Sequence, residues 1–251
     1  MKKIITATLL ASAAMMAAPA EAAQYLITYS GVVSNGIDMV GGVFNSSPAE
    51  RLTGLRFVAR YTLTVPTPGS VTLNSPGNSS IFGGGFYTGV APVTPLTATL
   101  TINGVTQSFG QIYGYSGFVL QRDNDFGRDT LRHDVSDYFD DGTIRVSRTL
   151  NFLVDTFVNN IVNTTDFTAP LVYHPQLGDN ATGNFDFQEY LNSYSIHSSQ
   201  AAGSLVPDLV TIEALGGTPG VPEPASWGLM IAGFGLVGGA MRRRVARVSF
   251  G

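Results

Sequence analysis

The chain has 251 residues, of which 44% are hydrophobic and 13% are charged, and its formal net charge is −4 at pH 7. A chain this apolar, with 15 Phe and 10 Tyr, is not an intrinsically disordered acidic protein. The sequence contains no Cys, which excludes a disulfide scaffold, a thiolate zinc site and a cysteine nucleophile.

Basic residues are concentrated at the two ends of the chain. Between residues 22 and 221 there are eight Arg and no Lys, against sixteen Asp and Glu. Nucleic-acid binding draws most of its affinity from Lys and Arg contacts with phosphate. The acidic excess therefore argues against a nucleic-acid partner.

The N-terminal segment has the pattern of a secretory signal peptide. Lys2 and Lys3 precede an Ala-rich apolar run over residues 4–18, and Ala20 and Ala22 occupy the −3 and −1 positions of a cleavage site. We therefore predict a signal peptide over residues 1–22 and export of the remainder. The alternative is a buried helix of the folded domain.

Alternation of apolar and polar residues predicts β-strands after the signal peptide. The clearest runs cover residues 55–65, 96–102 and 105–109. Asn103 and Gly104 separate the last two runs, and this pair is typical of a type I′ hairpin turn, in which both positions need φ > 0.

The acidic stretch that follows is the candidate for a metal site. Asp123, Asp125 and Asp129 offer oxygen ligands of the kind that Ca²⁺ prefers. The stretch departs from the EF-hand pattern, because Gly127 stands at the fifth position and Asp134 at the twelfth. The alternative to a weak calcium site is a pair of solvated turns, and we predict no other cofactor.

His133 is the residue that comes nearest to a catalytic base, since Asp134 and Asp137 are close in sequence. In a strand, however, residues 133 and 134 point to opposite faces of the sheet. We therefore predict a solvated polar edge here, no catalytic residue and a protein that is not an enzyme.

The second half of the domain continues the β-pattern. Asp141 and Gly142 predict a hairpin turn into a strand over residues 144–154, although a helical pattern also fits residues 152–161. Further strands are predicted at residues 24–33, 115–122, 185–198 and 208–214, and loops at residues 75–80 and 180–184. Short strands with turn signals between them predict an all-β fold, an antiparallel β-sandwich or jelly roll over residues 23–217.

A short linker, residues 218–221, leads to an apolar tail. Pro222, Glu223 and Pro224 precede Trp227, and Arg242, Arg243, Arg244 and Arg247 follow the apolar run over residues 225–241. As a helix this run spans roughly 25 Å, against a hydrocarbon core of about 30 Å. Trp at one border and Arg at the other favour a membrane helix with the Arg cluster in the cytoplasm.

The tail resembles the PEP-CTERM sorting signal in its PEPxxWA form, over residues 222–247. The resemblance rests on Pro222, Glu223, Pro224 and Trp227, the Gly-rich apolar span, and the basic stop at 242–244. Gly228 stands where the family usually has Ala. The alternative is a simple permanent anchor.

The resemblance implies processing near residues 222–224 by an exosortase, a membrane-embedded cysteine transpeptidase of bacteria that make exopolysaccharide. It implies an intermediate in the inner membrane, followed by release or attachment at the cell surface, the outer envelope or outside the cell.

Two functions are compatible with this sequence. The first is a non-enzymatic structural or interaction protein of the envelope or matrix, linked to exopolysaccharide or biofilm. The second is a carbohydrate-binding or polysaccharide-active module. Tyr87, Tyr113, Tyr115 and Tyr138 are candidates for stacking on sugars, because Trp227, the single Trp, lies in the tail.

Overall fold

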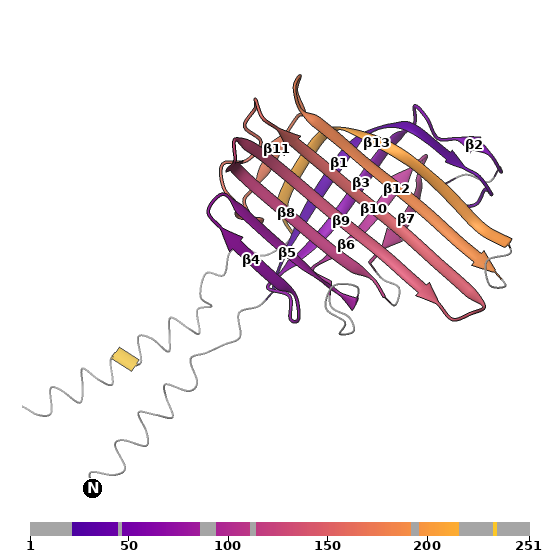
Figure 1. Ribbon diagram of the computed structural model, residues 1–251, viewed down its shortest axis with the longest axis horizontal. Helices are drawn as coiled ribbons and strands as arrows, with labels where there is room; N and C mark the ends of the chain where they lie inside the picture. Colours follow the sequence, from indigo (N-terminus) through magenta and orange to yellow (C-terminus); the bar gives the residue numbers. More distant parts are fainter. Residues whose placement is uncertain are drawn as a thin grey trace, which may run out of the picture. The chain divides into compact units, whose positions relative to one another are not determined.

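The computed structural model describes residues 22–44, 47–85, 94–110, 114–191, 196–215 and 233–234. It divides into two compact units, Met1–Leu215 and Gly216–Gly251. Within the described part of the first unit, thirteen strands form one sheet (Figure 1). The strands are β1 (Ala23–Asp38), β2 (Glu50–Arg51), β3 (Arg56–Val65), β4 (Val71–Ser75), β5 (Asn78–Gly84), β6 (Leu96–Ile102), β7 (Val105–Phe109), β8 (Ser116–Asp125), β9 (Arg128–Asp140), β10 (Ile144–Thr156), β11 (Leu171–Tyr173), β12 (Asn180–Leu191) and β13 (Ile196–Ala214).

The sheet is antiparallel and continuous. Its order is β4-β5-β8-β9-β10-β12-β13-β1-β3-β6-β7, with β11 added to β13 and β2 added to β1. The long strand β13 pairs with β12 over residues 196–205 and with β1 over residues 201–214, so it joins the two halves of the sheet.

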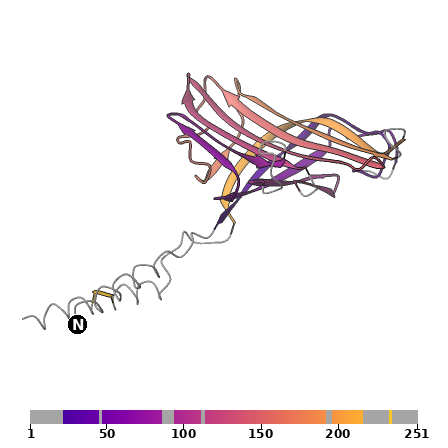
Figure 2. The same cartoon turned by 60° about the horizontal axis from the view of Figure 1, so that its bottom comes forward.

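The sheet curls so that one face encloses the core, with β1, β3, β6 and β7 behind β8, β9, β10 and β12 (Figures 1 and 2). Aromatic rings meet across this fold. Phe152 of β10 stacks on Tyr29 of β1, with ring centroids 4.3 Å apart, and Phe109 of β7 packs on Phe187 of β12 at 4.8 Å. Gly183 of β12 leaves space for one ring, since a Cβ atom there would lie 2.4 Å from the Phe152 side chain.

The all-β antiparallel prediction is confirmed, and the sandwich is replaced by a single curled sheet. The predicted strands at 55–65, 96–102, 105–109 and 144–154 correspond to β3, β6, β7 and β10. Asn103 and Gly104 have φ of 53° and 78°, as the type I′ turn requires.

Several strand boundaries differ from those predicted. The single strand predicted at 185–198 covers parts of both β12 and β13, and the loop predicted at 180–184 is the start of β12. The loop predicted at 75–80 is a turn only at residues 76–77, and its other residues belong to β4 and β5. The helical alternative at 152–161 is wrong, because β10 pairs with β9 and β12 as far as residues 155–156.

The two predicted targeting segments lie almost entirely outside the described residues. For the signal peptide, only Ala22 is described. In the tail only Gly233 and Phe234 are described, and both have helical backbone. No helix among the residues that the structure describes has the length and apolarity needed to cross a membrane.

Candidate functional site on the outer face of the sheet

Mostly short polar side chains cover the outer face of β8, β9, β10, β12, β13 and β1, opposite the core. The strand registers place them in two rows that cross the sheet. The first row is Phe118, Asp134, Asn151, Asn184, Ser204 and Asn35. The second row is Ser116, Ser136, Thr149, Asp186, Ala202 and Ile37. We call these two rows the polar face.

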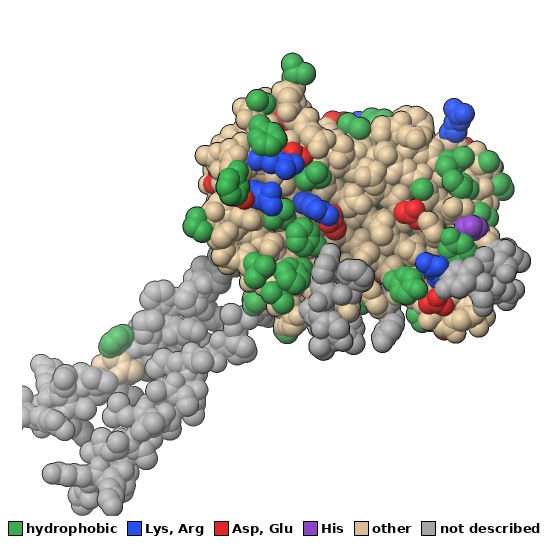
Figure 3. Space-filling view, in the orientation of Figure 1, with side chains coloured by type: hydrophobic (Ala, Val, Ile, Leu, Met, Phe, Trp, Pro, Cys, Tyr) green, Lys and Arg blue, Asp and Glu red, His purple; other side chains and the backbone are tan. Residues whose placement is uncertain are grey.

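The polar face is hollowed at two places that meet at Thr149. One depression of about 410 Å³ lies over β10, β12, β13 and β1, and includes Asn184 and Asp186. The other, of about 200 Å³, lies over β8, β9 and β10, and includes Asp134 and Asn151. The corresponding part of the surface is mostly uncharged (Figure 3).

Hydrogen bonds along the first row orient its amides. The Ser204 hydroxyl donates to Asn184 Oδ1 at 3.0 Å, and Asn184 Nδ2 lies 3.4 Å from Asn151 Oδ1. These contacts leave the Asn151 amide nitrogen and one Asn184 amide hydrogen to face solvent or a ligand. The row therefore offers amide donors, with the second lone pairs of the two amide oxygens as acceptors.

Two half-buried carboxyls flank this row. Burial raises the pKa of Asp134, although the hydrogen bond and charge of Arg132, 2.7 Å away, act in the opposite direction. Burial likewise raises the pKa of Asp186, against a hydrogen bond from Gln188. Asp134 Oδ1 is buried and has no hydrogen-bond partner among the described residues.

Asp134 and Asp186 lie on different strands of the polar face. They are two strands apart and two residues apart along the strands, which gives a Cα separation of about 12 Å.

His133 lies on the inner face and Asp134 on the outer face, as the strand argument predicts. The expected solvated edge is wrong, because His133 is 1% exposed and its Nδ1 forms a 2.7 Å hydrogen bond with the Tyr29 hydroxyl. Burial lowers the pKa of His133 to about 3. Asp137 is also buried and accepts a hydrogen bond from the Gly110 amide.

The three predicted calcium ligands lie in and beside the hairpin between β8 and β9. Asp129 Oδ1 accepts from the Asn124 amide and its Oδ2 accepts from the Ile161 amide, both at 2.8 Å. Asp125 lies 3.6 Å from Arg122 Nε, and Asp123 donates its backbone amide to Gly77. In the described ranges there is no group of three His, Asp or Glu side chains arranged to hold a metal ion.

The remaining predicted residues fall into two groups. Among the tyrosines, Tyr138 is 47% exposed, with the Arg145 guanidinium 5.7 Å from its ring, and Tyr115 is half-buried. The other predicted residues lie outside the described part of the chain. They are Tyr87, Tyr113 and the processing residues Pro222, Glu223, Pro224, Trp227, Arg242, Arg243 and Arg244. The polar face was not predicted, because its rows join six strands whose register a single sequence does not specify.

Comparison with known proteins adds an assignment for the tail. Residues 220–244 match the PEP-CTERM protein-sorting motif. The match is confined to the C-terminal region, as the resemblance to PEPxxWA signals predicts. The PEP-CTERM motif implies targeting to an exosortase and export through the membrane to the surface or the outside of the cell. No curated protein and no solved structure matches the chain.

Proposed function

We propose that the chain is an exported exosortase substrate whose β-domain is a non-enzymatic structural or interaction component of the exopolysaccharide matrix or cell envelope. The tail holds the chain in the inner membrane until it is processed near residues 222–224. The PEP-CTERM match at residues 220–244 is the observation that carries this proposal.

The structure of the domain supports a role without turnover. The one histidine that has carboxylates beside it in sequence, His133, is enclosed in the core, where a substrate has no access to it. The half-buried carboxyls of the polar face, Asp134 and Asp186, lie two strands apart, and Asp134 is paired with Arg132.

The second candidate function is binding of a carbohydrate at the polar face, and the polar rows favour it. Sugar hydroxyls are both donors and acceptors, and the first row presents the amides of Asn151 and Asn184 side by side. Arg132 lies over Phe118 at one end of the row, with 5.4 Å between guanidinium and ring centroid.

The test of processing is mass spectrometry of the C-terminus of the protein isolated from cells that contain the exosortase. We expect a mature chain that ends near residue 222 and lacks Arg242, Arg243 and Arg244. The triple variant P222A/E223A/P224A should keep its tail. Intact arginines on the isolated wild-type protein would contradict processing.

The test of the polar face is a glycan array together with a hydrolase assay on residues 23–220. If the face binds sugars, N151A/N184A should weaken binding at least tenfold, whereas the neighbouring exposed substitution T182A should not. Hydrolysis that D134N abolishes would instead favour a polysaccharide-active enzyme and would overturn the non-enzymatic proposal.

A further inference from the structure

Four large apolar side chains lie exposed on loops and turns at one end of the sheet. Phe126 is 97% exposed, Phe157 69%, Val158 72% and Leu177 100%. We call these four residues the apolar tips. Green side chains lie among arginines in this part of the surface, at the upper left of Figure 3.

The exposure and the backbone conformation of Phe126 bring no benefit to the folded domain. It begins the turn between β8 and β9 with φ of 55°, followed by Gly127 with φ of 75°. This left-handed conformation favours Gly, Asn and Asp and is unfavourable for a bulky residue. A fully exposed Phe that also strains its turn gives no stability to the domain, which points to a role outside it.

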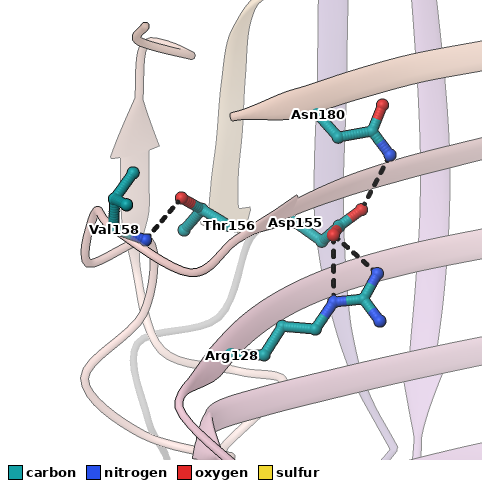
Figure 4. A network of polar contacts seen from close by, with 5 residues as sticks. All are labelled: Arg128, Asp155, Thr156, Val158 and Asn180. Atoms are coloured by element: carbon teal, nitrogen blue, oxygen red, sulfur yellow. Dashed lines mark hydrogen bonds and ion pairs between the residues drawn. The ribbon is translucent and has the colours of Figure 1, made fainter. Parts of the chain in front are cut away.

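The other tips are held close together by polar contacts beneath them. Arg128 Nε donates to Asp155 Oδ2 at 2.9 Å (Figure 4). The same guanidinium lies 5.3 Å from the Phe157 ring centroid. Thr156 Oγ1 accepts from the Val158 amide at 3.2 Å. The tips on residues 157–158 are therefore fixed by the ends of β9 and β10.

Leu177 is held against the same loop. Asn159 Nδ2 donates to Asp179 Oδ1 at 2.7 Å and lies 3.3 Å from the Leu177 carbonyl. Burial alone would raise the pKa of Asp179, but hydrogen bonds from Asn159, the Gln176 amide and Tyr173 outweigh it and lower that pKa. The carboxylate that organises this turn therefore stays charged at neutral pH.

The apolar tips lie at the end of the sheet from which the chain leaves the domain. In an antiparallel sheet the C-terminal end of one strand lies beside the N-terminal end of the next. Thr130 pairs with Asp155, and Asp155 with Asn180, so the tips flank the ends of β9, β10 and β12. Strand β13 runs toward that same end and finishes at Ala214.

We propose that the apolar tips insert into the surface of the lipid bilayer that holds the tail. This inference rests on the proposed membrane-held form of the chain. Residues 216–224 join the domain to the predicted membrane segment, and at about 3.5 Å per residue they reach roughly 30 Å at most. The end of the sheet that carries the tips is thus kept close to the bilayer.

Separate tips suit a deformable lipid surface better than a shaped protein pocket. The tips present two aromatic rings, which favour the interface between lipid head groups and acyl chains. The arginines beside them are neutralised, Arg128 by Asp155 and Arg122 by Asp125. Binding should therefore depend on apolar contact and change little with salt.

Because the tail tethers the domain to the membrane, a weak contact between the apolar tips and the bilayer is enough to keep the tips inserted. A short linker raises the effective concentration of the bilayer at the domain, so tips that bind weakly on their own are occupied while the tail is in place. Processing near residue 222 removes the tether, so the released domain should bind the bilayer only where the lipid concentration is high.

The experiment uses residues 23–220, which contain every described strand pairing, and vesicles of phosphatidylethanolamine and phosphatidylglycerol at a ratio of 3:1, at a millimolar lipid concentration that makes up for the missing tether. We expect co-sedimentation that the variant F126S/F157S/L177S weakens at least tenfold. The matched control is M39S/I144S/L191S, which removes three exposed apolar side chains at the opposite end of the sheet and should bind like wild type.

A spectroscopic readout reports contact with lipid directly. Residues 23–220 contain no Trp, so F126W places a single indole in the turn, and its emission should shift to shorter wavelength when vesicles are added. Urea unfolding of each variant checks that its fold is unchanged. Because this domain lacks the tail, the result is independent of the processing measured by mass spectrometry.

Three results would overturn the proposal: no binding of the wild-type domain, equal binding of the tip variant, or an unshifted F126W spectrum on vesicles that sediment the protein. A concentration-dependent dimer that F126S/F157S/L177S dissociates would assign the tips to a second copy of the chain instead.

Discussion

The imidazole of His133 lies in an apolar part of the core, where burial holds its pKa at about 3. In the unfolded chain a histidine has a pKa of about 6.5. Between these values the unfolded state binds a proton that the folded state does not, so the stability that depends on His133 is lost as the pH falls from 6.5 toward 3. The slope is about 1.4 kcal/mol per pH unit.

We predict that H133Q has a flatter pH dependence of unfolding free energy between pH 6 and pH 4. Glutamine does not titrate, and it retains a polar partner for the Tyr29 hydroxyl. Urea unfolding at several pH values gives the measurement, with the exposed residue His174 as control through H174Q. A wild-type slope in H133Q would show that other groups cause the acid sensitivity. Asp134 and Asp186, whose pKa values are raised, act in the opposite direction and are common to both proteins.

At the scale of elements, one carboxylate joins a hairpin to a long loop. Asp129 at the start of β9 accepts from the Ile161 and Val162 amides, at 2.8 and 3.3 Å, and so anchors the loop after β10. Its other oxygen accepts from Asn124 in the turn. Asp129 is 6% exposed, so loss of these bonds leaves buried donors without acceptors.

D129N should therefore lower the unfolding free energy by about 1–3 kcal/mol. The measurement is urea unfolding in EDTA and again in calcium. We expect the same loss in both, because the carboxylate serves backbone amides. A wild-type protein that calcium stabilises and a variant that calcium does not would instead identify Asp129 as a ligand.

The elements that the sequence predicts well are those with one apolar face and one polar face. Strand β3 buries Phe57, Ala59, Tyr61 and Leu63, so its alternation is unambiguous. Strand β9 was missed because His133 and Asp137 face inward, where an apolar residue is expected. Strand β4 was missed because all of its side chains are exposed.

The candidate sites were predictable only where they are continuous in sequence. The sorting motif is a single stretch of chain, and it is recognisable without any structure. The polar face joins residues from Asn35 to Ser204, and the apolar tips join three segments between residues 126 and 177. Exposed Phe and Leu become informative only once burial is known, since most apolar residues enter the core.

At the scale of the whole molecule, the sheet and the tail are separate units. The strand pairings and the core cluster of the described residues lie within residues 23–214. We therefore predict that residues 23–220 unfold at the same urea midpoint as the full chain, both in the same detergent, with far-ultraviolet circular dichroism of the sheet as the probe. A lower midpoint for the isolated domain would mean that the tail contributes to its stability.

The placement of β13 has a mechanical consequence. The tail follows directly from this strand, which is the longest in the described sheet and is paired on both sides, with β1 on one and with β12 and β11 on the other. Tension applied through the anchor is thus borne by two ladders at once, and β13 yields only when both are sheared. A domain tethered through an edge strand such as β4 would instead peel apart one hydrogen bond at a time.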